Sequence, residues 1–236
     1  MKGKWLRRGM AVGIAAALGN FCGCGLIIQP PISNTTISSV KPTQIQPSFL
    51  EFPQTLPDST LIVEEIVHYQ GRYWEDGSGD MVQDVAGIML YNPTDRMIEF
   101  EAIALEQEGE QLYFFAYQLP PQSRCLVLER KRKTCEAQKI SACRELSTRW
   151  GHQEFSREQV DYVGLGPLLT IVNRDSGQQE HITVRYKQYV KEGDYYLGGV
   201  AYSAHLFALQ PEERRTVTPE HYHAGKARIV AITVNA

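Results

Sequence analysis

Two stretches, MIEFEAIA at 97–104 and HITVRYKQYV at 181–190, decide the fold class of this chain. In both, apolar and polar side chains alternate at every second position, as on a strand that buries one face. The second stretch places Ile182, Val184, Tyr186 and Val190 on one face and His181, Arg185 and Lys187 on the other. The pattern predicts half-buried β-strands, with Lys187 on the polar face.

Turn signals separate the apolar stretches at short intervals. They are rich in Gly, Pro, Asn and Asp, and they read EDGSGD (75–80), NPTD (92–95), EGE (108–110), LPPQS (119–123), NRDSG (173–177) and KEGD (191–194). Short strands punctuated in this way are typical of a β-sandwich. The sequence predicts an all-β chain, although residues 134–150 fit a helix as well as a strand.

The chain also repeats its order of strands and turns. Residues 87–129 and 168–220 both run apolar strand, Asn, turn, alternating strand, Gly turn, aromatic strand, Pro turn and strand. The alignment pairs Asn92 with Asn173 and Arg124-Cys125 with Arg215-Thr216, and it puts an insertion near 197–205 of the second copy. It predicts two tandem β-sandwich domains, at 61–150 and 160–236.

The order VEEIVHY, NPTD, EGE and PPQS resembles the FxLYD-type and related immunoglobulin-like domains of bacterial surface lipoproteins. Asn92-Pro93, Gly109 and Pro120-Pro121 carry the likeness, which covers 61–129 and, more weakly, 165–220. Leu105-Glu106 stand near the place where the family usually has Tyr-Asp before the Gly turn. The resemblance implies immunoglobulin-like domains in an accessory, non-enzymatic envelope protein.

The N-terminal stretch has the layout of an export signal or membrane anchor, which we place at 1–24. Four Lys and Arg residues lie within the first eight positions, and the apolar run 10–18 follows. Gly23-Cys24 resembles a lipoprotein processing site and predicts lipidation of Cys24. Two alternatives stay open: residues 10–28 are uncharged and about long enough to span a bilayer, or the signal is cleaved and the chain is secreted. The expected location is extracytoplasmic, anchored to the cell membrane.

Residues 25–60 are predicted to form a disordered linker. Six prolines lie between 29 and 60, among many Ser and Thr, so the segment has little apolar surface to bury. A net charge of −3 argues against nucleic acid as the main partner. The expected partners are the membrane, through the N-terminus, and a protein or cell-wall component.

Three cysteines remain after the N-terminal pair is set aside. Cys125, Cys135 and Cys143 offer three choices for one disulfide. A catalytic thiol needs a nearby base, and Cys125 lies in an apolar strand. The sequence contains no serine nucleophile elbow, phosphate loop or Cys-x-x-Cys. We therefore expect a binding or structural module that is not an enzyme and uses no cofactor.

Two imidazoles form the one candidate metal pair. In Glu220-His221-Tyr222-His223 both histidines can share one face of a strand, and His205 or Glu220 could complete a site. Because a His-x-His pair on a turn is more often polar surface, the sequence favours no metal. An envelope metal-binding protein or enzyme that uses His205, His221 and His223 is the alternative function.

Two charged segments are expected to be ordinary surface. The segment 75–80 lacks the Gly and Glu that a calcium loop has at its sixth and twelfth positions, so we predict a hairpin turn. The segment ERKRK at 129–133 is predicted to be a solvated loop, with binding to anionic wall polymers or lipid headgroups as the alternative.

Overall fold

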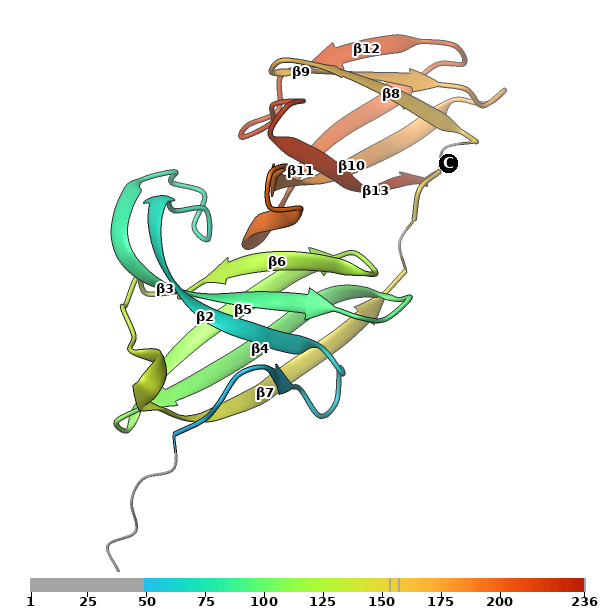
Figure 1. Ribbon diagram of the computed structural model, residues 1–236. Coiled ribbons are helices and arrows are strands. Elements are labelled where there is room, and N and C mark those ends of the chain that lie inside the picture. Colours follow the sequence, from blue (N-terminus) through green and yellow to red (C-terminus); the bar gives the residue numbers. More distant parts are fainter. Residues whose placement is uncertain (1–48, 153, 157, 236) are drawn as a thin grey trace, which may run out of the picture. The chain divides into compact units, whose positions relative to one another are not determined.

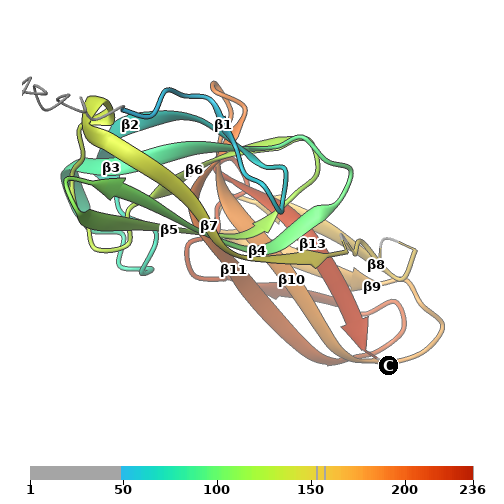
Figure 2. The same cartoon turned by 90° about the horizontal axis from the view of Figure 1, so that it is seen from below.

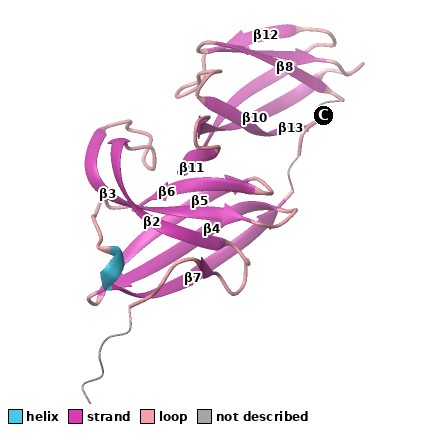
Figure 3. Cartoon of the chain, in the orientation of Figure 1, coloured by secondary structure: helices cyan, strands magenta, loops and turns pink. Residues whose placement is uncertain are grey.

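The computed structural model describes residues 49–152, 154–156 and 158–235, and this part of the chain is all-β (Figures 1 and 3). Its one helical element is a short 3-10 turn at Ala137–Lys139. The strands are β1 (Gln54–Thr55), β2 (Ile62–Arg72), β3 (Met81–Asn92), β4 (Met97–Gln107), β5 (Glu110–Leu119), β6 (Ser123–Leu128), β7 (Ile140–Gly151), β8 (Val160–Leu165), β9 (Leu168–Asn173), β10 (Gln179–Val190), β11 (Tyr195–Leu209), β12 (Arg214–Val217) and β13 (Ala227–Asn235). The prediction of an all-β chain is confirmed.

Strands β2–β7, the first repeat, and strands β8–β13, the second repeat, have the same topology. The order β5-β4-β7 in the first repeat corresponds to β11-β10-β13 in the second, and β2-β3-β6 corresponds to β8-β9-β12. A seven-stranded sheet has the order β1-β2-β3-β6-β11-β10-β13, and the two other sheets have three strands each. Figure 2 shows β11, β10 and β13 side by side.

The buried asparagines of the repeat make matching contacts. Asn92 ends β3 and Asn173 ends β9, and the side-chain NH₂ group of each donates to the carbonyl four residues further on, at 2.8 Å in both copies. Each also donates to a leucine carbonyl, that of Leu119 at 3.3 Å or Leu209 at 3.0 Å. Because both side chains hold the same turn to the same strand, these contacts support the alignment of Asn92 with Asn173.

The strand register corrects one detail of that alignment. Arg124 lies opposite Tyr91, the residue before Asn92, and Arg214 lies opposite Val172, the residue before Asn173. Arg124 therefore corresponds to Arg214 and not to Arg215, one residue away from the predicted match.

The repeats are joined by strand pairing, so they are not separate bodies along the chain. Residues Arg124–Leu126 of β6 pair in parallel with Tyr195–Leu197 of β11. This pairing makes the seven-stranded sheet continuous, and the described residues from 49 to 235 belong to one compact unit. The predicted domain limits at 150 and 160 mark the passage from one repeat to the next, but the sheet crosses that limit.

Three buried clusters stabilise this unit. The first cluster includes Ile88, Leu90 and Phe114 of the first repeat and extends to Tyr196 and Val230 of the second. The second cluster lies inside the second repeat around Ile182 and Val184. A third cluster of Tyr73, Val82, Val85, Leu126 and Leu128 packs with Tyr195 and Leu197 of β11. The third cluster therefore adds apolar burial to the strand pairing that joins the repeats.

The folded part begins earlier than the predicted residue 61. Leu56 is buried, strand β1 pairs with β2, and the backbone N–H of Leu50 donates to the carbonyl of Ile140 at 2.7 Å. Leu50 and Phe52 pack against the first cluster. The apolar residues between the prolines at 49–60 therefore belong to the core and not to the predicted linker 25–60.

Predictions about the N-terminus, including lipidation of Cys24, lie outside the described residues. In the part that the structure describes, no helix is long and apolar enough to cross a membrane. Segment 134–150, which the sequence left between helix and strand, contains the 3-10 turn and most of β7.

Candidate functional site

The second repeat contains an insertion that its counterpart lacks. In the β10–β11 pair, Tyr186 lies opposite Tyr202 and Gln188 lies opposite Leu197, so residues 198–201 bulge out opposite Lys187. The equivalent β4–β5 pair has no register shift. This bulge, Gly198-Gly199-Val200-Ala201, is called the junction insertion below, and it agrees with the insertion predicted near 197–205.

Two glycines allow the junction insertion to approach the first repeat. Gly198 has a φ of +83°, which side-chain-bearing residues rarely adopt. A Cβ atom on Gly199 would lie 1.7 Å from the carbonyl oxygen of Phe115 in β5. The insertion can therefore touch β5 only where a side chain is missing.

The first repeat presents the turn 73–80 between β2 and β3 at the same place. Arg132 fixes this turn, because its Nη2 lies 2.6 Å from Asp76 Oδ2 and 3.0 Å from Asp80 Oδ2. The backbone N–H of Ser78 donates to Asp76 Oδ1 at 2.9 Å. The segment is a hairpin turn, as predicted, and its two aspartates, Asp76 and Asp80, are already paired with Arg132.

Glu75 connects this turn to the junction insertion. Its Oε1 accepts the backbone N–H groups of Leu128 and Gly199, both at 2.8 Å, and its Oε2 lies 3.0 Å from the same Gly199 nitrogen. Only 4% of the residue is exposed. Burial raises the pKa of the carboxyl to about 6, and the two N–H donors and Lys187 oppose that rise.

Lys187 binds the carbonyl group of Gly199, whose N–H group is bound by Glu75. Its Nζ donates to the carbonyls of Gly199 at 2.8 Å, Val200 at 2.9 Å and Tyr117 at 2.8 Å. The side chain is fully buried, and burial lowers its pKa. The prediction of Lys187 on an outward polar face is wrong, because the junction insertion folds over it and replaces water with three carbonyl oxygens.

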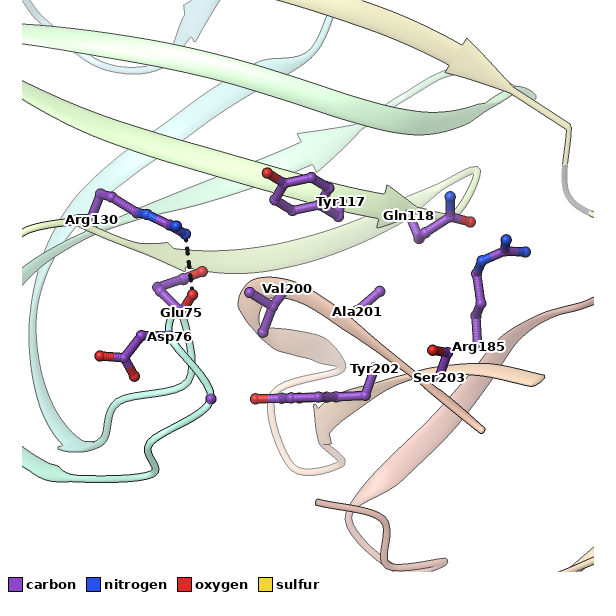
Figure 4. A pocket seen from close by; sticks show the side chains of 11 residues that line it. Glu75, Asp76, Tyr117, Gln118, Arg130, Arg185, Val200, Ala201, Tyr202 and Ser203 are labelled. Atoms are coloured by element: carbon purple, nitrogen blue, oxygen red, sulfur yellow. Dashed lines mark hydrogen bonds between the residues drawn. The ribbon is translucent and has the colours of Figure 1, made fainter. Parts of the chain in front are cut away.

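A cleft of about 630 Å³ opens beside this contact (Figure 4). We call it the junction cleft. Tyr117 of β5 and Tyr202 of β11 lie on opposite sides of it in Figure 4. The other lining residues that Figure 4 labels gather toward two ends, Glu75, Asp76 and Arg130 at one and Gln118, Arg185 and Ser203 at the other, with Val200 and Ala201 between them. Gly77 completes the lining.

The charged side chains that line the junction cleft have hydrogen-bond partners within the described chain, except at one end. Asp76 is paired with Arg132, and Arg130 Nη1 donates to the backbone carbonyl of Glu75 at 3.2 Å. The half-buried guanidinium of Arg185 has no ion pair and no hydrogen-bond partner within the described ranges. The cleft therefore carries a free positive charge at the end where Gln118 and Ser203 lie.

A chain of polar side chains runs from the cleft along β11 and β10. Ser203 Oγ lies 2.9 Å from His205 Nε2, and His205 Nδ1 lies 3.1 Å from His181 Nε2. The two nitrogens of His205 thus contact a hydroxyl on one side and an imidazole on the other. This arrangement orients Ser203 at the cleft edge, and its hydroxyl can exchange a proton with His205.

The three histidines of the predicted alternative do not come together. His205 contacts Ser203 and His181, whereas the His221 ring lies 4.7 Å from the Tyr202 ring centroid and His223 Nδ1 accepts the N–H of Gly225 at 3.2 Å. Throughout residues 49–235, apart from the two undescribed positions, no group of three or more His, Cys, Asp and Glu is placed to hold a metal ion.

The three predicted disulfide candidates are free thiols in the structure. Cys125 is buried, and its Sγ contacts the carbonyl of Gly198 at 3.2 Å. Burial raises the pKa of Cys125, Cys135 and Cys143 to about 11 each. A thiol with so high a pKa is a poor nucleophile at neutral pH, and Cys125 instead contributes to the junction.

The basic run at 129–133 is an exposed loop that contacts the turn 73–80. Glu129 is buried and accepts the backbone N–H groups of Lys131 and Lys133, while Arg130 and Arg132 contact the turn and Lys133 pairs with Glu110. The predicted solvated loop is therefore found at Arg130, Lys131 and Arg132, which are exposed, whereas Glu129 at its start is buried.

The chain matches no protein-family model, no curated protein and no solved structure. The role of the junction cleft must therefore be inferred from its lining residues and their contacts.

Sequence reasoning missed Glu75, Arg185 and Tyr202 as cleft residues. One signal was present: Gly198-Gly199 lies inside a strand pattern, and paired glycines there indicate a bulge or a close backbone approach. The partner of that bulge lies more than a hundred residues away in sequence, so the cleft itself had no local signal.

Proposed function

We propose that this chain is a membrane-anchored, extracytoplasmic binding module whose ligand occupies the junction cleft. The junction insertion carries this proposal, because the second repeat departs there from the first and lines an open cleft. Clefts of 300–1,000 Å³ with a few placed polar groups are the usual form of ligand sites.

The N-terminal pattern supports the anchor, and the repeated topology supports two immunoglobulin-like domains of the FxLYD type. In this proposal Cys24 is lipidated and the prolines before residue 49 hold the folded unit away from the membrane. The test is the intact mass of the chain extracted from its native membrane fraction. A species that begins at Cys24 and carries acyl groups supports the lipoprotein, whereas an unmodified full-length mass replaces it with a spanning anchor.

Occupation of the cleft is testable by site-specific photocrosslinking in the full-length chain. A photoreactive residue at Gln118, which lines the cleft, is compared with one at Glu192, an exposed residue in the β10–β11 turn. We expect an envelope component to crosslink at 118, to be competed by excess unmodified chain, and to be missing at 192. Equal crosslinking at both positions, or none at 118, would remove the cleft as the binding site.

A second candidate function is hydrolysis of an ester in the same cleft, and the Ser203–His205–His181 chain favours it. In this alternative His205 accepts the Ser203 proton as the hydroxyl oxygen attacks the carbonyl carbon, and it returns the proton to the leaving alkoxide. Water then releases the acyl group from Ser203. A fluorophosphonate probe that labels the chain, and fails to label the Ser203→Ala and His205→Ala variants, supports the enzyme. No labelling leaves the binding module.

A further inference from the structure

We infer that the junction cleft recognises a sugar that carries a single carboxylate, either free or as a unit of an envelope polysaccharide. The inference rests on the proposed binding function and names its ligand class. It follows from the charge, the aromatic side chains and the polar groups of the cleft, taken in turn.

The anionic group of the ligand follows from Arg185. This guanidinium lines the cleft without a partner in the described chain, whereas Arg130 and Asp76 are already bonded. A planar guanidinium matches a carboxylate through two parallel hydrogen bonds. Ser203 lies directly opposite Arg185 in the strand register, so its hydroxyl adds a second hydrogen-bonding group at the same end.

The opposite end of the cleft limits the ligand to one negative charge. Glu75 and Asp76 are acidic. Arg132 pairs with Asp76, and the charge of Arg130 at this end is offset by that of Glu75, so little positive potential is left for a second anion. A chain of phosphates or a nucleic acid would place a further negative charge against these carboxylates. Hydroxyl groups of a ligand, in contrast, can donate to them.

The sides of the cleft suit a saturated ring. Tyr117 and Tyr202 lie on opposite sides in Figure 4, and both are half-buried, so their rings have exposed surface. Aromatic rings offer a flat apolar surface to the C–H face of a sugar, while Gln118 offers both a donor and an acceptor to its hydroxyls. A carboxylated sugar matches the cation, the rings and the neutral polar group at once.

The test is calorimetric titration of the full-length chain in detergent micelles with D-glucuronic acid, glucose and acetate. We expect binding of glucuronic acid at least ten times tighter than of glucose or acetate, since glucose lacks the charge and acetate lacks the ring. Arg185→Gln should weaken glucuronic acid binding at least ten-fold. Arg214→Gln, at an exposed arginine of β12 outside the cleft, is the matched control and should leave it unchanged.

Each other result overturns the inference. Equal affinity of wild type and Arg185→Gln for glucuronic acid, tighter binding of glucose or acetate, or no detectable binding of glucuronic acid all exclude the carboxylated sugar. If crosslinking at Gln118 still captures a competed envelope component, the binding function stands and only the ligand class is wrong. If that crosslink also fails, the proposed function fails with it.

Discussion

The substitution Lys187→Met tests whether the buried lysine holds the two repeats together. Methionine has about the same length, but it cannot donate to the carbonyls of Tyr117, Gly199 and Val200. It also removes one of the two cations, Lys187 and Arg130, that favour the charged form of the buried Glu75 carboxyl. Removing one partner of a buried charged network costs about 3–5 kcal/mol, part of which is regained because methionine is easier to bury. We expect a loss of about 3 kcal/mol in the free energy of unfolding.

The assay is guanidinium denaturation of wild type, Lys187→Met and the control Lys191→Met, an exposed lysine in the neighbouring turn. Adding Glu75→Gln completes a double-mutant cycle, and the two substitutions should couple by about 1–3 kcal/mol because they act on the same Gly199 peptide. Apolar replacements of buried charges are sometimes neutral or stabilising. A Lys187→Met chain as stable as wild type, or a cycle with no coupling, would refute the account of the junction.

Three further predictions concern the junction, a buried carboxyl and the repeat. Gly199→Ala should open the junction and speed hydrogen exchange at residues 198–201, since its Cβ would lie 1.7 Å from the Phe115 carbonyl oxygen. The control is Gly177→Ala, whose Cβ would have no atom within 4 Å and which should leave that exchange unchanged. Glu101 is fully buried, and burial raises the pKa of its carboxyl from 4.5 to about 8 despite the Thr148 hydroxyl bond. Because the folded state then binds the proton more tightly than the unfolded state, this carboxyl's contribution to stability falls as the pH rises from 4.5 to 8. Glu101→Gln should therefore gain about 3 kcal/mol relative to wild type between pH 5 and pH 8.5 in urea denaturation, and an unchanged difference would contradict the shift. Asn92→Ala and Asn173→Ala should each cost about 2–3 kcal/mol by the same assay, because each leaves buried carbonyls without a donor; a cost in one copy alone would argue against equivalent roles.

Local sequence patterns were sufficient to predict the strands, the repeat and the position of the insertion. Alternation over 97–104 and 181–190 reflects one buried face, and Asn-containing turns reflect local hydrogen bonds, so neighbouring residues carry both signals. The end of the linker was missed because Leu50, Phe52 and Leu56 are isolated apolar residues among prolines. Only the finished core shows that Leu56 is buried and that Leu50 and Phe52 pack against the first cluster.

The burial of Lys187 and the parallel pairing of β6 with β11 had no local signal. Alternation assigns Lys187 to an outward face, and that assignment would hold if β10 had water on that side. The junction insertion covers it instead, and the three carbonyls that accept its hydrogen bonds come from both repeats. A contact between segments distant in sequence therefore reverses what the period predicts.

The differences between the repeats are the strongest argument for where the function lies. Leu165 pairs with Leu168, so a two-residue turn joins β8 to β9, whereas Arg72 pairs with Met81 and eight residues join β2 to β3. Strand β11 carries three extra residues that β5 lacks, because residues 198–201 lie opposite the single residue 187. One difference enlarges the first repeat and the other enlarges the second, yet both segments meet at Glu75 and Gly199 and line the same cleft. Neither extra segment is needed to pack a repeat, because each segment occurs in one repeat only and the other repeat packs without it. The two extra segments act together only at the junction, where Arg185, Tyr117 and Tyr202 line one cleft beside them.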